Sequence, residues 1–479
     1  MSVNSIEFFL FFLLVFFIYF FLLKKNYKSQ NFFLLLASYF FYGYADLKML
    51  PLLVISTLVF YSLGIGIAKN NTKGPKKRSS ALLTLGVTFG VVLLLYFKYL
   101  NFLITSFSEM FDSAGLHTDI HTLQILLPLG ISFFTFRLIS YVIEVNKGTM
   151  EPTRNIVTFG AYVAFFPCLL SGPIDRPQKF MPQLEKARPF NYQLAVDGLR
   201  QILWGMFKKM VIADNLATPV NNIWTDYTFQ SGSTLVWVAI LYSFQIYADF
   251  SGYSDMAIGV SKLLGFDVAK NFNYPYFSRN MSEFWRKWHM SLTSWLTDYV
   301  YIPLGGSRCS KSRQFFNTMI VFTLCGFWHG ANWTFACWGA YNGLLFLPLI
   351  LKKKRKRPSM VAEGKLLPSF HEVLSMIGTF LLATFGWIIF RADSLGQAFD
   401  YVAHMFKATL FSIPAHGRAG VFYIVVLILI EWLQRHHEFP LQMENQIKSP
   451  MLKWSIYYVL IASILLLAGT GSQYIYFQF

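Results

Sequence analysis

The chain has 479 residues, of which 55% are hydrophobic, 19% aromatic and 14% charged, with a formal net charge of +17. Soluble domains carry about 25% charged residues, so the composition excludes an ordinary soluble protein and indicates a polytopic membrane protein. The positive charge does not indicate a nucleic-acid partner, because the sequence shows no soluble domain with a basic face and interleaved aromatic residues.

Apolar runs near the roughly 20 residues that a helix needs to cross a bilayer recur along the chain. The clearest runs are 6–23, 49–67, 81–99, 123–142, 235–250, 335–351, 373–390 and 454–467, and shorter runs are 32–44, 157–170, 202–212, 318–328 and 421–433. The first run has no basic segment before it and no small-residue cleavage site, so we expect a retained span rather than a signal peptide. The sequence therefore predicts an all-α integral membrane protein, with a single membrane domain over 1–479 and roughly eleven spans plus re-entrant helices.

Basic residues gather in three clusters, at Lys24, Lys25 and Lys28, at 69–78, and at 352–357, where the sequence reads KKKRKR. Such clusters mark cytoplasmic loops and also contact acidic membrane lipid. With these loops inside, the alternation of runs predicts that the amino terminus and the carboxyl terminus both lie outside. The short run that begins at Val157 has basic stretches on both sides, so we expect it to re-enter the membrane without crossing it.

His329 lies in the segment CGFWHGANWTF, 325–335, which is otherwise apolar and aromatic. The runs on either side both have basic outer ends, so they form a predicted hairpin from the cytoplasm with His329 near its turn. Ionisable groups at membrane depth are costly and usually face a cavity or a partner. Trp328 is placed to wall a pocket, and Asn332 to shape the turn. Two interpretations stay open: a histidine hydrogen-bonded between helices, or a functional group in a pocket.

His289 lies in a second long motif, NMSEFWRKWHMSLTSWLTDYVYIPLGGSR, 280–308. Asn280 followed three residues later by Glu283 resembles a capping box, so we expect a helix to begin there. Apolar and aromatic residues then recur at helical spacing on one face, which carries Trp285, Trp288, His289, Leu292, Trp295, Leu296 and Tyr299. The spacing predicts that His289 points inward with the tryptophans, and an interfacial amphipathic helix is the alternative.

Asp249 and Asp255 lie in the motif QIYADFSGYSDMAIG, 245–259, at the end of a membrane run. Carboxylates at this depth bind a substrate hydroxyl, relay a proton or pair with a cation. We expect them to pair with Arg279 or Arg286, and we treat them as supporting residues of the site.

Together these motifs resemble the membrane-bound O-acyltransferase (MBOAT) family. The resemblance is carried by FWRKWHMSLTSWLTDYVYIPLGG at 284–306 and by GFWHGANWTF at 326–335. The segments LPLGISFFTF at 127–136, AFFPCLLSGPI at 164–174 and ADFSGYSDMAIG at 248–259 are similar to the bacterial branch of the family that O-acetylates exported polysaccharides such as alginate and peptidoglycan.

The resemblance implies a helical bundle around a tunnel in the bacterial cytoplasmic (inner) membrane, with acetyl-CoA as a cytoplasmic thioester donor. It implies that His329 is required for catalysis and that His289 occupies a second, more variable polar position, with either a chemical or a positioning role. The core of the site is expected at 279–343. The residues expected to line the tunnel or bind the donor are Trp285, Arg286, Trp288, Trp328, Asn332, Asp249 and Asp255.

No bound cofactor and no metal are expected. The thiolate of coenzyme A is already a good leaving group, and a neutral imidazole can accept a hydroxyl proton near neutral pH. The sequence also has no P-loop, dinucleotide-binding fingerprint, zinc-protease helix or nucleophile-elbow motif.

The last residues, GSQYIYFQF at 471–479, form a short tail that the charge pattern places outside. Tyr476 matches the carboxyl-terminal aromatic motif of the bacterial branch, whose tyrosine has been proposed to carry the acyl group covalently. An aromatic residue at the membrane interface is the alternative. We expect His329 to activate Tyr476, which then passes acetyl to an extracytoplasmic partner, an SGNH or serine esterase-like O-acetyltransferase.

Two other functions stay open. A D-alanyl transferase of the kind that modifies teichoic acid belongs to the same superfamily. A non-catalytic transport conduit is a candidate from another class, although we find no related halves of the kind that transporters often show.

Overall fold

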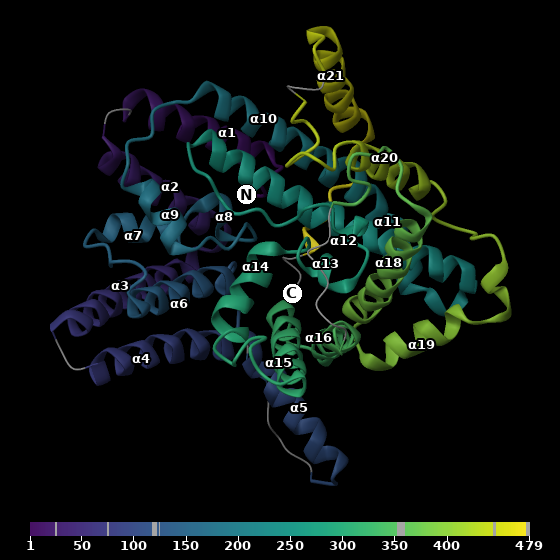
Figure 1. Ribbon diagram of the computed structural model, residues 1–479, viewed down its shortest axis with the longest axis horizontal. Helices are drawn as coiled ribbons and strands as arrows, with labels where there is room; N and C mark the ends of the chain where they lie inside the picture. Colours follow the sequence, from purple (N-terminus) through teal and green to yellow (C-terminus); the bar gives the residue numbers. More distant parts are fainter. Residues whose placement is uncertain are drawn as a thin grey trace. The chain divides into compact units, whose positions relative to one another are not determined.

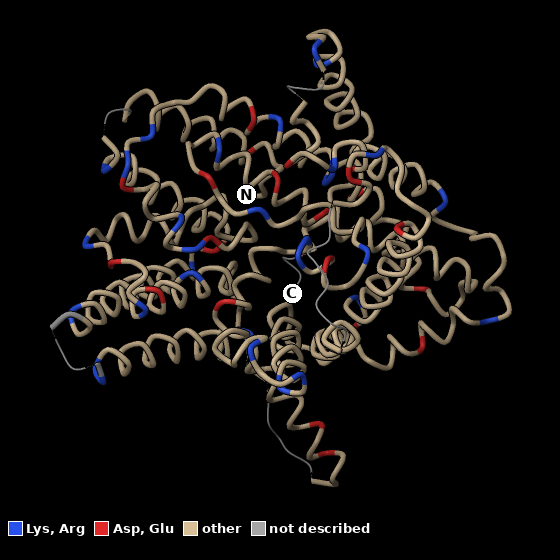
Figure 2. The backbone as a smooth tube through the Cα atoms, viewed as in Figure 1, with Lys and Arg blue, Asp and Glu red and all other residues tan. Residues whose placement is uncertain are grey.

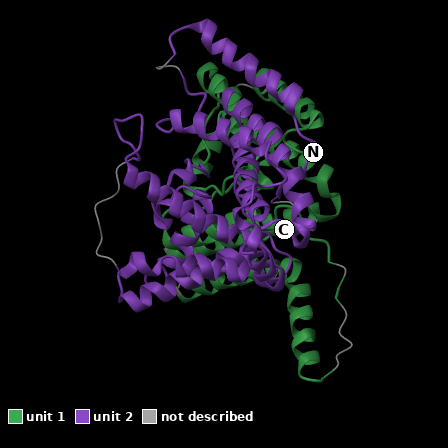
Figure 3. Cartoon of the chain, turned by 90° about the vertical axis from the view of Figure 1, so that its right-hand side faces the viewer, with its two compact units in different colours: residues 1–199, 257–269 green, residues 200–256, 270–479 purple. Residues whose placement is uncertain are grey.

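The computed structural model describes residues 1–23, 26–73, 76–116, 122–123, 125–351, 360–443 and 447–475. Within these ranges every regular element is a helix (Figure 1), which confirms the predicted all-α class. The chain divides into two compact units (Figure 3), unit 1 with residues 1–199 and 257–269 and unit 2 with residues 200–256 and 270–479. The expectation of one membrane domain stays a prediction.

Unit 1 contains α1 (Ile6–Phe17), η1 (Ile18–Leu22), α2 (Tyr27–Asp46), η2 (Leu47–Met49), α3 (Leu50–Lys73), α4 (Lys76–Leu94), η3 (Leu95–Tyr99), α5 (Leu100–Ser113), α6 (Ile131–Lys147), α7 (Ile156–Val163), α8 (Phe166–Leu169) and α9 (Pro177–Leu184). Unit 2 contains η4 (Phe207–Ala213), α11 (Asp214–Thr225), η5 (Tyr227–Phe229), η6 (Pro275–Phe277), α13 (Met281–Trp285), α14 (Met290–Leu296), η7 (Thr297–Tyr301), α15 (Lys311–His329), α16 (Trp333–Leu344), α17 (Leu347–Leu351), α18 (Phe370–Arg391), α19 (Leu395–Met405), η8 (Ala408–Phe411), α20 (Gly420–Leu433) and α21 (Pro450–Leu467). The helices α10 (Tyr192–Met206) and α12 (Gly232–Leu263) contribute residues to both units.

Among the described residues, six stretches of helix are long and apolar enough to cross a membrane. They are Tyr27–Asn71, Lys77–Ser113, Gly232–Leu263, Trp333–Leu351, Phe370–Arg391 and Pro450–Leu467. The charged residues of α2 and α18 lie at their ends, so that the middle of each helix is uncharged (Figure 2). The expected total of roughly eleven spans and the placement of both termini stay predictions. The basic residues Lys24, Lys25 and 352–357 lie outside the described residues.

Two of the predicted apolar runs are broken in unit 1. The run 123–142 is helical only from Ile131, because Pro128 disfavours helix before it and Gly130 adopts a left-handed backbone with φ of 68°. The run 157–170 consists of the two short helices α7 and α8. Neither is long enough to cross a bilayer, which agrees with the expectation that this run does not cross.

Arg137 on α6 holds the broken segment of unit 1 together. Its side chain is buried, and its guanidinium donates hydrogen bonds of 3.0 to 3.4 Å to the carbonyl oxygens of Tyr162, Val163, Cys168 and Pro173. Carbonyl groups at helix ends are costly to leave unpaired in an apolar interior. A guanidinium has five donors and no acceptor, so one buried arginine satisfies several of them at once.

The helices α15 and α16 of unit 2 form the predicted hairpin, which Figure 1 shows as two adjacent green helices. Their backbones approach so closely that a Cβ atom on Gly326 would lie 2.0 Å from the carbonyl oxygen of Phe335. A Cβ atom on Gly339 would lie 2.2 Å from the carbonyl oxygen of Phe322. The hairpin therefore depends on glycine at both positions, and it places His329 at the end of α15. The side of the membrane from which the hairpin enters stays a prediction.

We expect Gly326→Ala to lower the free energy of unfolding by about 1 to 3 kcal/mol, because the added methyl group overpacks the contact between α15 and α16. The matched control is Gly378→Ala on α18, where a Cβ atom meets nothing within 4 Å. That change should be neutral or stabilise the helix by about 0.5 to 1 kcal/mol. Thermal unfolding in detergent measures both, and equal unfolding temperatures for the two variants would contradict the close packing.

Candidate active site

His289 lies in a tight turn that breaks the single amphipathic helix expected from Asn280 onward. The helix does begin as predicted, since the Asn280 side chain accepts a hydrogen bond of 3.0 Å from the backbone N of Glu283. However, α13 ends at Trp285, and His289 adopts a left-handed backbone with φ of 42°. The backbone N of Met290 donates to the carbonyl oxygen of Asn271 at 2.8 Å instead of continuing a helix. The expectation of one continuous helix was therefore wrong.

The two histidines lie close together in unit 2. The ring centroids of His289 and His329 are 6.4 Å apart, and their side chains are buried, with exposed fractions of 1% and 4%. His289 lies in the turn before α14, outside the helices that are long enough to span a membrane. Burial lowers its pKa to about 3, because a charged imidazole is disfavoured in an apolar interior. His289 is therefore a neutral imidazole at physiological pH.

Aromatic rings surround the histidine pair. Trp328 lies 5.5 Å from His289 and 5.0 Å from His329 between ring centroids. Phe250 lies 4.7 Å from His289, and Trp338 and Phe390 each lie 5.2 Å from His329. These rings come from α12, α15, α16 and α18, so four helices contribute to one apolar enclosure. Two further residues predicted for the site belong to its wall, since Trp285 packs on Trp338 and Trp288 packs on Trp387.

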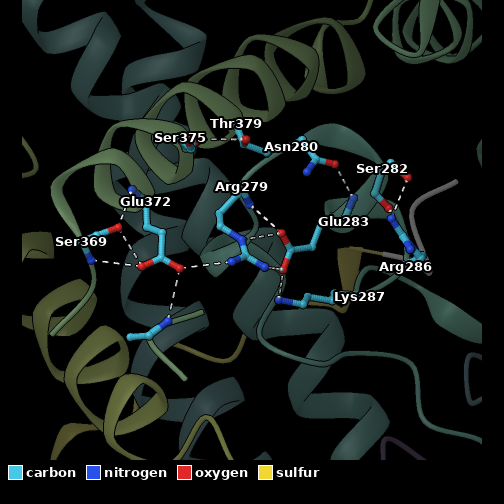
Figure 4. Close-up of polar contacts among 11 residues, drawn as sticks. Arg279, Asn280, Ser282, Glu283, Arg286, Lys287, Ser369, Glu372, Ser375 and Thr379 are labelled. Atoms are coloured by element: carbon cyan, nitrogen blue, oxygen red, sulfur yellow. Dashed lines mark hydrogen bonds and ion pairs between the residues drawn. The ribbon is translucent and has the colours of Figure 1, made fainter. Parts of the chain in front are cut away.

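A network of charged side chains fixes the segment that leads to His289 (Figure 4). Arg279 donates from its backbone N and its Nε to Glu283 Oε2, at 3.0 and 3.2 Å, and Lys287 Nζ donates to Glu283 Oε1 at 3.0 Å. Arg279 also reaches Glu372 at the start of α18, at 3.1 Å. Burial acts to raise the pKa of Glu283, but Lys287 and Arg279 outweigh it and hold the pKa below its usual value. A pocket of about 200 Å³ opens beside this network, with Glu283, Lys287 and Arg435 among its lining residues.

Two residues predicted to line a tunnel make their described hydrogen bonds to local backbone and caps. Arg286 is exposed, and its guanidinium donates to the carbonyl and hydroxyl oxygens of Ser282 within its own turn (Figure 4). Asn332 caps α16, since its side chain accepts from the backbone N of Thr334 at 3.0 Å and donates to the carbonyl oxygen of Asp393 at 3.0 Å. In this structure both side chains stabilise local backbone.

Asp249 and Asp255 pair with two lysines that the sequence analysis missed. Lys209 Nζ lies 2.7 Å from Asp249 and 2.9 Å from Asp214, and Lys208 Nζ lies 2.6 Å from Asp255. The expectation of pairing with Arg279 or Arg286 was therefore wrong. Both lysines lie on the π-helix η4 and are buried. The available signal was the pair of adjacent lysines inside the apolar run 202–212, because charges at that depth require partners.

The carboxyl-terminal segment reaches the same cluster. The backbone N of Ile475 donates to Asp249 Oδ2 at 2.9 Å, and Lys209 Nζ donates to the carbonyl oxygen of Ser472 at 2.9 Å. Tyr476, the predicted acyl carrier, is the next residue and lies outside the described residues.

Comparison with known proteins identifies the family. Residues 35–365 match the model of the membrane-bound O-acyltransferase family, a stretch that contains both histidines and their aromatic enclosure apart from Phe390 and Trp387. The chain belongs to the membrane-bound O-acyltransferase family. It is therefore a multi-pass membrane O-acyltransferase.

The chain is similar to proteins named for O-acetylation and to proteins named for D-alanylation. The chain is 38% identical to a probable alginate O-acetylase AlgI of Azotobacter vinelandii, over 77% of this chain and 70% of the relative. It is 34% identical to a peptidoglycan O-acetyltransferase of Helicobacter pylori, over 76% of this chain and 72% of the relative. A teichoic acid D-alanyltransferase of Bacillus subtilis is 30% identical, over 55% of this chain and 68% of the relative. The two O-acetylating relatives thus match a larger share of this O-acyltransferase than the D-alanylating one does.

We expect His289→Asn to be more stable to unfolding than His289→Ala by about 1 kcal/mol, because Asn tolerates the left-handed backbone that costs Ala about that much. Thermal unfolding of the two purified variants measures this difference. Activity assays on the same samples separate two roles. If His289 positions reacting groups, His289→Asn should retain more acyl-transfer activity than His289→Ala. If His289 transfers a proton, both variants should lose the activity. An alanine variant as stable as the asparagine variant would argue against strain at this turn.

We expect Glu283→Gln to lower the free energy of unfolding by about 1 to 3 kcal/mol, because it removes the charge that Arg279 and Lys287 share in a partly buried site. The folded-state pKa of Glu283 lies below its unfolded value, so this stabilisation is present above about pH 4.3 and is lost as the pH falls. Arg286→Ala is the control, and should change stability by less than about 0.5 kcal/mol. Unfolding curves at pH 7 and pH 4 test both statements. Equal unfolding curves for wild type and Glu283→Gln at pH 7 would show that the charge network contributes nothing to the stability of the fold.

Proposed function

We propose that this O-acyltransferase moves an acetyl group from cytoplasmic acetyl-CoA across the membrane for the O-acetylation of an exported cell-surface polysaccharide, such as alginate or peptidoglycan. The observation that carries the proposal is the buried pair of His289 and His329, 6.4 Å apart within aromatic rings from four helices. The relatives named for alginate and peptidoglycan O-acetylation support the acetyl group and the polysaccharide. A helical tunnel that joins a cytoplasmic donor to an outer acceptor is part of this proposal.

The chemistry requires one base. His329, as a neutral imidazole, accepts the proton of an attacking hydroxyl, whose oxygen forms a bond to the carbonyl carbon of the thioester. The carbon–sulfur bond then breaks, and the thiolate of coenzyme A leaves and takes up a proton. The aromatic enclosure excludes water from the base, which limits hydrolysis of the thioester. His289 lies close enough to orient the reacting groups or to share in the proton transfer.

The attacking hydroxyl in this proposal is that of Tyr476. An acyl ester of tyrosine keeps the group activated, because a phenol with a pKa near 10 is a far better leaving group than a sugar alkoxide. The acyl group then passes to an SGNH or serine esterase-like O-acetyltransferase on the outer side, which supplies the polysaccharide specificity. The described tail supports this assignment, since it is bound as far as Ile475, one residue before Tyr476.

The D-alanyl alternative has support from the similarity to the teichoic acid D-alanyltransferase of Bacillus subtilis. The same base and the same tail would serve a D-alanyl thioester, so the donor decides between the two functions. A transport conduit, in contrast, requires no cleavage of a thioester.

We expect His329→Ala to reduce release of the coenzyme A thiol from acetyl-CoA by about a hundredfold or more, because a positioned general base contributes 10² to 10⁴ in rate. The purified protein in detergent is assayed with a thiol reagent. His416→Ala is the matched control, since this histidine lies exposed outside the site, and its release rate should equal that of wild type. A D-alanyl carrier is assayed as a second donor. Cleavage of only that donor would assign the D-alanyl function, and cleavage of neither would favour the conduit.

A further inference from the structure

The segment that follows α21 is bound against the π-helix η4 and α12 in unit 2. Its first contact is the backbone N of Gly469, which donates to the carbonyl oxygen of Met210 at 2.9 Å. Ser472 is held on two sides, since its hydroxyl donates to Asp214 at 2.6 Å and its carbonyl oxygen accepts from Lys209 at 2.9 Å. At Ile475 the backbone N donates to Asp249 at 2.9 Å. The tail is therefore anchored at three successive points.

The charged cluster and the tail complement one another. Lys209 lies between the carboxylates of Asp214 and Asp249, with side-chain exposed fractions of 0%, 2% and 3%. One lysine cannot satisfy all the oxygens of two buried carboxyl groups, so the cluster needs additional hydrogen-bond donors. The tail supplies one donor to each carboxylate, and Ser472 supplies two acceptors to the lysine, its carbonyl oxygen at 2.9 Å and its hydroxyl at 3.3 Å. The ion cluster is thus completed by the chain's own carboxyl-terminal segment.

We propose that Lys209, Asp214 and Asp249 form a receptor for this carboxyl-terminal segment and are positioning residues that fix the tail as far as Ile475, the residue before Tyr476, for acyl transfer. The functional half of this proposal rests on the relay role assigned to Tyr476 above. The docking half stands on the contacts alone and can be tested by itself.

The shape of the receptor supports docking of the tail, and so does its charge. A Cβ atom on Gly469 would lie 2.7 Å from the carbonyl carbon of Asp214 and 2.8 Å from the backbone N of Asn215. The tail therefore passes the junction of η4 and α11 at a distance that only glycine permits. A Cβ atom on Gly471 meets nothing within 4 Å. The tight fit is confined to the point where the tail enters the receptor.

The receptor lies next to the histidine pair along α12. Asp249, which binds Ile475, directly precedes Phe250, whose ring contacts His289 at 4.7 Å between centroids. Tyr253 lies one turn further along and packs against Tyr474 of the tail at 5.0 Å. Positions three residues apart are neighbours on a helix surface, so the end of the described tail lies about one helical turn from the ring that contacts His289.

The adjacent lysine provides an internal comparison. Lys208 pairs with Asp255 at 2.6 Å and donates to the Ser251 hydroxyl at 2.8 Å. It lies on the same π-helix and is also buried, but neither it nor Asp255 has a contact with the described tail among their hydrogen bonds and ion pairs. A general destabilisation of η4 should therefore follow from removing either lysine, whereas release of the tail should follow only from removing Lys209.

The test is hydrogen exchange of the full-length protein in detergent, read by mass spectrometry on peptides that cover 469–475. Lys209→Met removes the charge of the receptor, and Gly469→Ala blocks the tail sterically without any change of charge. Each should raise the exchange rate of these amides by about tenfold or more, because a released segment exchanges like a mobile terminus. Lys208→Met and Gly471→Ala are the matched controls, and they should leave the tail as protected as in wild type.

The same four variants are then assayed with acetyl-CoA. Release of the tail should lower kcat by about a hundredfold, the cost of a small misplacement of a reacting group, while KM for acetyl-CoA stays unchanged because the donor does not contact the receptor in this proposal. Unchanged exchange in both Lys209→Met and Gly469→Ala would overturn the receptor. Faster exchange with unchanged kcat would overturn its positioning role.

These outcomes separate this proposal from the proposed function. If wild type does not cleave acetyl-CoA, the acetyl-transfer function fails, and the exchange comparison still decides whether the tail is bound by the cluster. If Lys209→Met does not fold, Gly469→Ala and its Gly471→Ala control carry the test, because neither changes a charge.

Discussion

A charge that is buried in a membrane protein has to find its partners within the chain, and much of this structure follows from that constraint. In unit 1 the buried Arg137 donates from its two terminal nitrogens to four carbonyl groups of the segment that it holds. In unit 2 the lysines of η4 are satisfied by carboxylates on α11 and α12. Each of these side chains joins elements that are distant in the sequence, so the cost of burying charge is offset only in the folded arrangement.

The histidine pair obeys the same constraint in a different way. The neutral imidazole of His289 carries no charge that must be compensated, so it can lie among the rings of Phe250 and Trp328. The low pKa of His289 is the direct result of that environment. An apolar enclosure that holds a neutral base suits acyl transfer from a thioester, because the reaction needs proton acceptance and the exclusion of water more than it needs a fixed charge.

Features that depend on composition and residue spacing could be predicted from the sequence. Features that depend on a single backbone angle or on a partner distant in the sequence could not. The hairpin of α15 and α16 could be predicted because the apolar runs, their basic outer ends and the glycines near the turn agree. The break before His289 could not, because nothing in a run of helix-forming residues indicates φ of 42° at a histidine; hydrogen bonds with the segment near Asn271 impose it. The partners of Asp249 were missed for a similar reason, since Lys209 is 40 positions away in the sequence and becomes a neighbour only through the packing of η4.

The helix α12 carries residues that belong to the charged cluster and residues that contact the histidine pair. Within five positions it carries Asp249, which binds the tail, Phe250, which contacts His289, and Tyr253, which packs on the tail. The π-helix η4 faces this stretch, and its i→i+5 hydrogen bonds place more residues in each turn than the 3.6 of an α-helix. Successive side chains are then separated by a smaller angle than the about 100° of an α-helix, so the adjacent Lys208 and Lys209 can both face α12. This local widening lets Lys208 pair with Asp255 while Lys209 pairs with Asp214 and Asp249 and also binds the tail.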